Sequence, residues 1–218
     1  MEILPLEQKK LWPELHPSTK LGFVLYGGTA VALRLGHRAS VDFDFFTEKP
    51  LNREALQSAF HFITQAVVLQ DLPNHLSLLV PRKDSNHKNI KLSFFGEIGM
   101  GRVGKPDITE DGVLQVASVD DLMATKTKVI LQRIEAKDYR DIAAMLRSEV
   151  SLPKGLAAAR AMYGINFQPS ESLKAMVYFE GGDLNTLTTE EKNTLVSAVS
   201  KVRNLPRVEI LDRRLGIS

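Results

Sequence analysis

The sequence contains no cysteine among its 218 residues, which excludes disulfide bonds and every zinc site built on thiolate ligands. It also lacks an apolar run close to the roughly 18 to 20 residues that a membrane-spanning helix needs. The N-terminus has no basic stretch followed by an apolar one, so no export signal is expected. We therefore expect a soluble, cytoplasmic protein that makes no contact with a membrane.

The chain also has little excess of positive over negative charge. The 28 basic and 26 acidic residues leave a formal net charge of +2, so the overall charge does not indicate a polyanionic partner. The five histidines form neither an H-x-H nor an H-E-x-x-H pattern, which argues against zinc. With 44% hydrophobic and 25% charged residues, the composition is that of an ordinary globular protein, and function must be sought in local motifs.

The first half of the chain predicts a mixed α/β fold. An apolar strand over 23–26 meets a Gly-Gly-Thr turn, and a helix follows over 30–35. A strand over 41–46 alternates in polarity, which places Asp42 and Asp44 on one face. The other elements expected in this half are a helix over 52–63 and strands over 66–69, 76–80, 90–95 and 113–116, with a polar stretch over 81–89 before the third of these strands.

The second half is expected to be mostly helical as far as the C-terminus. A helix start at Ser118 is followed by helical spacing that continues to Arg133. Further helices are expected over 137–146, 156–162, 170–179 and 190–202, the last capped by Thr188 or Thr189. This change of pattern predicts an α/β (α+β) domain with a mixed sheet over residues 1–116 and an all-helical domain over residues 117–218 that completes a cleft.

A glycine-rich segment over 99–105 fits two nucleotide-binding patterns, G-x-G-x-x-G and G-x-x-x-x-G-K. Both patterns require the last glycine to open a helix, whose N-terminal amides hold phosphate. Here Pro106 follows Lys105, and the residues up to Gly112 have no helical period. We interpret the segment as a mobile connector.

A second glycine motif lies close to two carboxylates. Gly27, Gly28 and Thr29 stand between the first strand and the first helix, and Asp42 and Asp44 follow on the next strand. Glycines at such a turn let backbone amides approach a triphosphate, and two neighbouring carboxylates repel one another until a divalent cation relieves the repulsion. Each motif alone is also explained by tight packing or by a solvated strand face. Together they indicate a site for a metal ion and a nucleotide.

These residues resemble a known family. Gly-Gly-Thr followed by the segment Leu35–Phe46, with its D-x-D, is similar to the AbiEii nucleotidyltransferase toxin family of the polymerase-β-like superfamily. Later segments over 121–126 and 137–141 are similar to that family's helix-borne lysine and its Lys/Arg-Asp-x-x-Asp motif. The four segments occur in the family's order.

The resemblance implies an enzyme that transfers a nucleotide from a nucleoside triphosphate to an acceptor hydroxyl and releases pyrophosphate. It implies Mg²⁺ or Mn²⁺ as cofactor, a tRNA or protein acceptor, and a cognate antitoxin as partner. Asp42 and Asp44 would hold the metal, Lys126 would contact phosphate, and Asp138 would orient Lys126 or join the catalytic set. The nucleotide-binding residues that it implies are Gly27, Gly28, Thr29, Arg38, Ser40 and Lys126.

One family feature is missing. Fully equipped superfamily members carry a third carboxylate on a later strand, where this chain has Ser93. Glu97 would share its face if the strand continued past Gly96, and Asp138 is our preferred replacement. The gap leaves open a one-metal enzyme, a different acceptor, or a catalytically silent protein that binds nucleotide without turnover. Kinase-like phosphotransfer from the same site is a separate alternative.

Simpler interpretations remain for several of these residues. The acidic and basic residues over 126–141 could form surface ion pairs, and Arg38 could shield the two aspartates when no metal is bound. Lys126 and Arg133, seven residues apart, are expected on one helical face. Ser40 has no evident histidine or acid partner in the sequence, so a hydrolase triad is unsupported.

Overall fold

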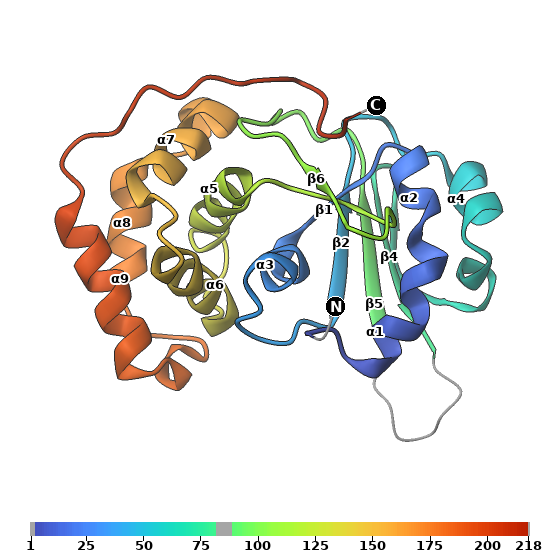
Figure 1. The fold of residues 1–218 in the computed structure, drawn as a ribbon, viewed down its shortest axis with the longest axis horizontal. Helices are drawn as coiled ribbons and strands as arrows, with labels where there is room; N and C mark the ends of the chain where they lie inside the picture. The colour runs from blue at the N-terminus through green and yellow to red at the C-terminus, as the bar shows by residue number, and fades with distance from the viewer. Residues whose placement is uncertain (1–2, 82–88, 218) are drawn as a thin grey trace. The chain divides into compact units, whose positions relative to one another are not determined.

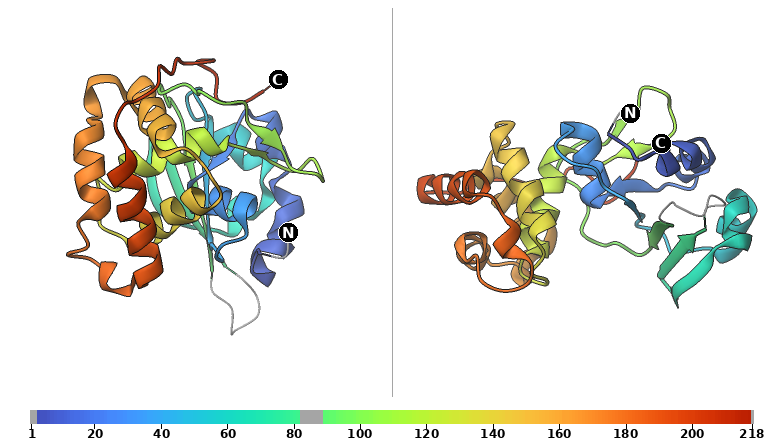
Figure 2. Two further views of the ribbon diagram at one scale, coloured as in Figure 1. Left: turned by 60° about the vertical axis from the view of Figure 1, so that its left-hand side comes forward. Right: turned by 90° about the horizontal axis from the view of Figure 1, so that it is seen from below.

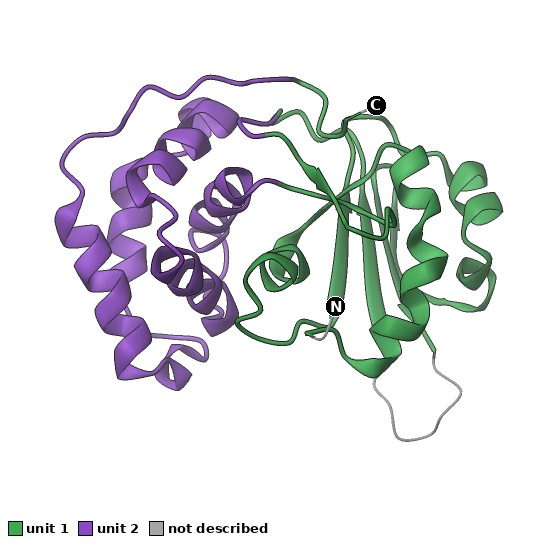
Figure 3. Cartoon of the chain, viewed as in Figure 1, with its two compact units in different colours: residues 1–101, 105–117, 213–218 green, residues 102–104, 118–212 purple. Residues whose placement is uncertain are grey.

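The computed structural model describes residues 3–81 and 89–217, so most of the polar stretch expected over 81–89 lies outside the described residues. The chain divides into two compact units (Figure 3). Unit 1 contains the chain up to Gly101, Lys105–Ala117 and the residues from Arg213 onward. Unit 2 contains Arg102–Gly104 and Ser118–Asp212. The chain therefore passes from one unit to the other at four points.

Unit 1 is built on a mixed sheet, as the sequence predicts, although β6 was not among the six strands expected and the described sheet has seven. Its strands lie in the order β3-β4-β5-β2-β1-β7-β6. β2 is antiparallel to β1 and parallel to β5, and β1 is parallel to β7. The strands are β1 (Val24–Tyr26), β2 (Asp42–Phe46), β3 (Val67–Leu72), β4 (His75–Val80), β5 (Ile90–Phe95), β6 (Asp107–Ile108) and β7 (Gln115–Val116).

The helices of unit 1 cover the sheet on both sides. α3 (Gly27–Leu35) lies on one side of the sheet, opposite α1 (Leu6–Leu11), α2 (Pro17–Lys20) and α4 (Arg53–Ala59) (Figure 1). The side covered by α1, α2 and α4 is apolar. The ring of Trp12, in the 3-10 turn after α1, is 6.3 Å from the ring of Phe43. Beyond α4, the Phe60 ring is 5.5 Å from that of Phe94. These aromatic contacts form the core beneath β2 and β5.

The alternating polarity of the sequence over β2 reflects the two different faces of this strand. Phe43 and Phe45 are fully buried in the aromatic core, whereas Asp42 and Asp44 are partly exposed on the other face. Successive side chains of a strand point to opposite faces, so burying the two phenylalanines fixes both carboxylates on the side of α3. The alternation predicted for this strand is confirmed.

Unit 2 is a bundle of helices (Figure 2). α5 packs against α6 and α7, and α9 packs against α6 and α8. Within the described residues, no helix combines the length and the apolar character needed to cross a bilayer. The helices are α5 (Val119–Val129), α6 (Ala136–Arg147), α7 (Leu152–Tyr163), α8 (Pro169–Val177) and α9 (Thr189–Lys201).

Three expectations about element boundaries are wrong. The helix expected over 52–63 stops at Ala59, because Phe60 has extended backbone angles, and a 3-10 turn over His61–Gln65 follows. The helix expected to reach Arg133 ends at Val129. The chain after Lys201 forms no further helix within the described residues, although helices were expected to the C-terminus.

The last residues return to the sheet of unit 1. Leu215 is fully buried, and its N–H donates to Glu48 Oε2 at 3.1 Å. The Ile217 N–H donates to the Gln115 side-chain oxygen at 2.8 Å, and the Gln115 amide donates back to the Ile217 carbonyl at 2.8 Å. This segment is fastened to β7 and to the loop after β2 by specific contacts.

Candidate active site

Gly27 and Asp44 meet at the corner where β1 turns into α3. Tyr26, the last residue of β1, pairs with Asp44 of β2 in the sheet. Gly27 has a φ of +73°, and a Cβ placed on it would lie 2.3 Å from Asp44 Oδ2. Only a glycine satisfies both the backbone angle and the space, so the Asp44 carboxylate packs directly against the backbone of the turn.

The N-terminus of α3 opens at the same corner. Gly27 and Gly28 are its first residues and are partly exposed, and no side chain among the described residues caps this end. The free amides and the positive end of the helix dipole favour an anion there. The sequence placed both glycines in a turn before the helix, whereas the structure includes them in its first turn.

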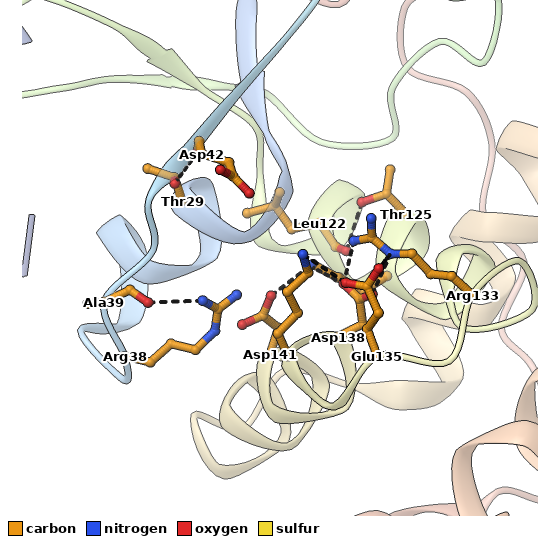
Figure 4. A network of polar contacts seen from close by, with 12 residues as sticks. Thr29, Arg38, Ala39, Asp42, Leu122, Thr125, Arg133, Glu135, Asp138 and Asp141 are labelled. Carbon is orange, nitrogen blue, oxygen red and sulfur yellow. Dashed lines mark hydrogen bonds and ion pairs between the residues drawn. The ribbon is translucent and has the colours of Figure 1, made fainter. Parts of the chain in front are cut away.

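Thr29 makes a structural contact that the sequence did not predict. Its side chain is fully buried, and its hydroxyl donates to the main-chain carbonyl of Asp42 (Figure 4). Thr29 stays a predicted nucleotide-binding residue, although its hydroxyl is bonded inside the protein in this structure. Thr29 fastens α3 to the start of β2, which keeps the helix N-terminus beside the two aspartates.

The two aspartates suit a hard divalent cation. Within the described residues, no group of three or more His, Cys, Asp or Glu side chains could hold a metal ion. A Mg²⁺ site does not require three such side chains, because Mg²⁺ is bound by one or two carboxylates together with substrate phosphates and water. Asp42 and Asp44, with the Asp44 carboxylate packed against Gly27 at the N-terminus of α3, fit that pattern of donors.

Ser93 occupies the place of the missing carboxylate. β2 and β5 are parallel and in register, with Asp44 opposite Ser93, so the two side chains lie on the same face. Glu97 does not replace it: β5 ends at Phe95, and Glu97 has a positive φ of 52°. The exposed carboxylate of Glu97 accepts a hydrogen bond from the Asn74 amide instead.

Arg38 and Ser40 lie in the loop between α3 and β2. Arg38 donates to the Ala39 carbonyl at 3.0 Å (Figure 4), and Ser40 is 8% exposed. Neither observation tests whether Arg38 or Ser40 binds a nucleotide, so both remain predicted nucleotide-binding residues.

The predicted residues of unit 2 form a buried ionic cluster. Lys126 of α5 lies 2.7 Å from Asp138 and 2.6 Å from Asp141, both on α6. The two carboxylates are fully buried and Lys126 is 4% exposed, so the interpretation as surface ion pairs is wrong for these three residues. Arg133 also donates to Asp138, at 2.8 Å, although it lies beyond the end of α5 (Figure 4). The loop rather than a shared helical face brings Arg133 to the cluster.

Asp138 is poorly suited to replace the third carboxylate. Burial raises the pKa of Asp138, but the hydrogen bond from Arg133 and the charge of Lys126 outweigh it, and the pKa lies below its ordinary value. A buried carboxylate that is held anionic by two cations is a weak proton acceptor. The alternative role, orienting Lys126, has the contact that it requires. The family resemblance implied Asp138, but Asp141 and Arg133 were not among the predicted site residues.

The segment over 99–105 forms no phosphate loop. Gly104 does not open a helix, because the next element is the strand β6. The N–H groups of Val103 and Gly104 donate to Asp121 at 2.8 and 3.3 Å. A Cβ on Gly104 would lie 2.1 Å from the Ser118 hydroxyl oxygen, so this glycine permits close packing. Arg102 is 6% exposed and bonded to Asp212, which is not what a mobile connector would show.

Comparison with known proteins agrees with this arrangement. The family model described as the nucleotidyl transferase AbiEii toxin, type IV TA system, matches residues 14–201. The chain belongs to this AbiEii family. An uncharacterized protein of Aquifex aeolicus, aq_aa25, is 31% identical over 160 residues, which cover 72% of this chain and 74% of that protein. Family membership makes this chain a nucleotidyltransferase of toxin type.

Solved structures show the same fold. A candidate nucleotidyltransferase from H. pylori matches with a TM-score of 0.59 and 18% identity, covering 89% of this chain and 92% of that one. MenT4, a nucleotidyltransferase toxin of Mycobacterium tuberculosis H37Rv, matches with a TM-score of 0.58 and 13% identity, covering 91% and 84%. The nucleotidyltransferase-like fold predicted from the sequence is confirmed.

Proposed function

We propose that this AbiEii-family chain transfers a nucleotide from a magnesium–nucleoside triphosphate to an acceptor hydroxyl, with release of pyrophosphate. The observation that carries the proposal is the corner of unit 1, where the uncapped N-terminus of α3 adjoins the carboxylate of Asp44 across Gly27. An anion-binding helix end next to two carboxylates matches the two parts of a metal-bound triphosphate.

The residues of this corner have separate tasks in the proposal. Asp42 and Asp44 hold the divalent cation, and the amides of Gly27 and Gly28 hold phosphate oxygens. When bound, Mg²⁺ supplies charge stabilisation for the attacking and leaving oxygens. Thr29 keeps α3 and β2 in place through the Asp42 carbonyl. Positioning and electrostatics then supply most of the acceleration.

In the same proposal, Asp138 fixes the position of the Lys126 ammonium group within unit 2, and contact of Lys126 with phosphate stays a prediction from the family resemblance. The contacts at 2.7 and 2.6 Å from Lys126 to Asp138 and Asp141 support the orienting role. A tRNA or protein acceptor and an antitoxin partner are proposed from family membership.

Labelled nucleotides test the reaction. The full chain is incubated with Mg²⁺, total bacterial RNA and each nucleoside triphosphate in turn, labelled either at the α- or at the γ-phosphorus. We expect α-label on the RNA or on protein, and about a 10²-fold or larger loss in Asp42→Ala and Asp44→Ala. Asp107→Ala is a matched control, because its carboxylate is exposed and pairs with Arg34.

Three outcomes would contradict the proposal. Transfer of γ-label instead of α-label would indicate a kinase-like reaction. Nucleotide binding without any transfer would indicate a catalytically silent protein. Transfer of α-label that survives both aspartate substitutions would remove the carboxylate pair from the mechanism.

A further inference from the structure

A row of polar side chains crosses three neighbouring strands next to Asp44. In the sheet register, Ser77 of β4 lies opposite Ser93 of β5, and Ser93 lies opposite Asp44 of β2. Residues opposite one another share a face, and adjacent strands are about 4.8 Å apart. The row therefore leads from the proposed metal site toward the hairpin of β3 and β4.

Hydrogen bonds connect this row. Ser93 Oγ and Ser77 Oγ are 3.0 Å apart, and Ser77 Oγ is 2.8 Å from His75 Nε2. The two serines are 2% and 3% exposed, so water does not replace these bonds. A hydroxyl can donate one hydrogen bond while it accepts another, which allows the direction of such a chain to reverse.

His75 is the end of the row and its only titratable member. Its ring stacks on Phe95, with centroids 4.3 Å apart and an angle of 23° between the planes. Burial and the nearby charges of Lys91 and Arg53 hold the pKa of His75 below its ordinary value, so the imidazole is neutral at pH 7 and can take up a proton. Asp71, which pairs with Arg53, and Glu97, which accepts from Asn74, are the acidic groups on adjoining segments.

The proposed reaction needs such a proton acceptor, because the attacking hydroxyl must lose its proton. Ser93 cannot serve as an anionic base near pH 7, and Glu97 and Asp138 are engaged elsewhere. A serine at this position can nevertheless pass a proton along if an acceptor is hydrogen-bonded behind it.

We propose that His75 is the proton acceptor of the nucleotidyl transfer, reached through Ser93 and Ser77. This inference rests on the proposed function. The acceptor oxygen bonds to the α-phosphorus as the bond from that phosphorus to the pyrophosphate oxygen breaks. The hydroxyl proton moves to Ser93 Oγ, the Ser93 proton moves to Ser77 Oγ, and the Ser77 proton moves to His75 Nε2. The imidazolium then returns its proton to water.

The rate of α-label transfer against pH tests the proposal. In the wild-type protein, the rate falls as the pH drops through the pKa of His75. His75→Gln is expected to be about 10²-fold slower and to lack that acidic limb. His61→Gln, at an exposed histidine, and Ser172→Ala, which removes a buried hydroxyl of unit 2, are matched controls with unchanged profiles. A full rate and an unchanged profile in His75→Gln would overturn the relay.

Ser93→Asp separates a relay from a merely structural role. A carboxylate at this position takes the proton itself, so His75→Gln should cost no more than about 2-fold in a Ser93→Asp background. Ser93→Ala and His75→Gln should each slow transfer, and the double variant should be no slower than either alone. Costs that multiply in the double variant would show that the two residues act independently, and the relay would be wrong.

The tautomer of His75 gives a readout that does not depend on activity. The relay requires neutral His75 to carry its proton on Nδ1, so that Nε2 accepts from Ser77. Imidazole ¹⁵N shifts report this at pH 7.5, with the signal assigned by its loss in His75→Gln. A proton on Nε2 would overturn the relay whatever the transfer rate. Absence of transfer with every labelled nucleotide would instead overturn the proposed function.

Discussion

Gly27 sits where no side chain fits, and the consequence can be measured. Gly27→Ala places a Cβ against the Asp44 carboxylate at a φ of +73°. We expect the free energy of unfolding to fall by about 1 to 2 kcal/mol from the backbone conformation. We also expect at least a 10-fold loss of α-label transfer, because Asp44 must move. Urea unfolding and the transfer assay measure the two effects.

Gly36 provides the matched control. It ends α3 with a φ of +64°, and a Cβ placed on it meets nothing within 4 Å. Gly36→Ala should therefore show a similar loss of stability while keeping the transfer rate. Equal losses of activity in both variants would mean that backbone strain, rather than contact with Asp44, explains the result.

The buried charges of unit 2 predict a dependence of stability on pH. The pKa of Asp138 is lower in the folded protein than in the unfolded chain, so its contribution to stability is present above the unfolded value. That contribution is lost as the pH falls through the folded value. Asp138→Asn should cost about 3 to 5 kcal/mol at pH 7, because it leaves Lys126 and Arg133 with fewer partners. The difference from wild type should shrink below about pH 4.

Urea unfolding at pH 7 and at pH 3 measures this difference. Asp120→Asn is the control, since Asp120 pairs with Lys154 near the surface, where an ion pair is worth about 0 to 1 kcal/mol. A difference between wild type and Asp138→Asn that stays constant with pH would show that Asp138 does not titrate in this way.

At the scale of single residues, the sequence predicted those features that depend on a short stretch of chain. The positions of Asp42 and Asp44 follow from the alternation of one strand, and they were found. The bond between Ser77 and Ser93 depends on how β4 pairs with β5, which residue spacing does not reveal. His75 was missed for the same reason.

Among the secondary-structure elements, α9 offers the cleanest test of a local signal. The sequence left Thr188 and Thr189 as alternative caps, and the structure shows Thr188 in a capping box with Glu191. Thr188→Ala should lower the free energy of unfolding by about 1 kcal/mol, because the Glu191 N–H loses its partner. Thr189→Ala, one residue further on, should change it by less than about 0.5 kcal/mol. Urea midpoints distinguish the two, and equal effects would contradict the assigned cap.

The predicted element boundaries are correct where local sequence signals are strong, and wrong where contacts between distant residues set the boundary. Ser118 accepts from the Asp121 N–H at 3.1 Å, and the predicted start of α5 is correct to one residue. α5 ends at Val129, four residues before the periodicity suggests, and Arg133 instead reaches Asp138. The short helices over 6–20 were missed, because prolines at 5, 13 and 17 interrupt their pattern.

For the whole molecule, the C-terminal segment is an integral part of unit 1. Leu215 is fully buried, whereas Leu211, four residues earlier, is 62% exposed. Leu215→Ala should destabilise the protein by about 2 to 5 kcal/mol through lost burial and the cavity that remains. Leu211→Ala should change stability by less than about 0.5 kcal/mol. A near-neutral Leu215→Ala in urea unfolding would show that the segment is not part of the fold.

The sequence could not predict this return. Residues 202–217 carry no helical or strand period, and the contacts of Leu215 with Glu48 and of Ile217 with Gln115 span 167 and 102 residues of the chain. The predicted domains, 1–116 and 117–218, rest on the change from mixed strands and helices to helices alone along the chain. Such a change does not reveal that Arg102–Gly104 belong to unit 2, or that the residues from Arg213 onward belong to unit 1.

The route of the chain determines how the protein can be dissected. A fragment ending at Ala117 would lack Leu215 and the partners of Gln115, and it would carry Val103 and Gly104 without the Asp121 carboxylate that binds their amides. Expression of either half from a single cut should therefore yield insoluble material. A circular permutant that joins the native ends and opens the chain elsewhere, or co-expression of two complementary pieces, would preserve those contacts and is the appropriate strategy for assigning activity to one unit.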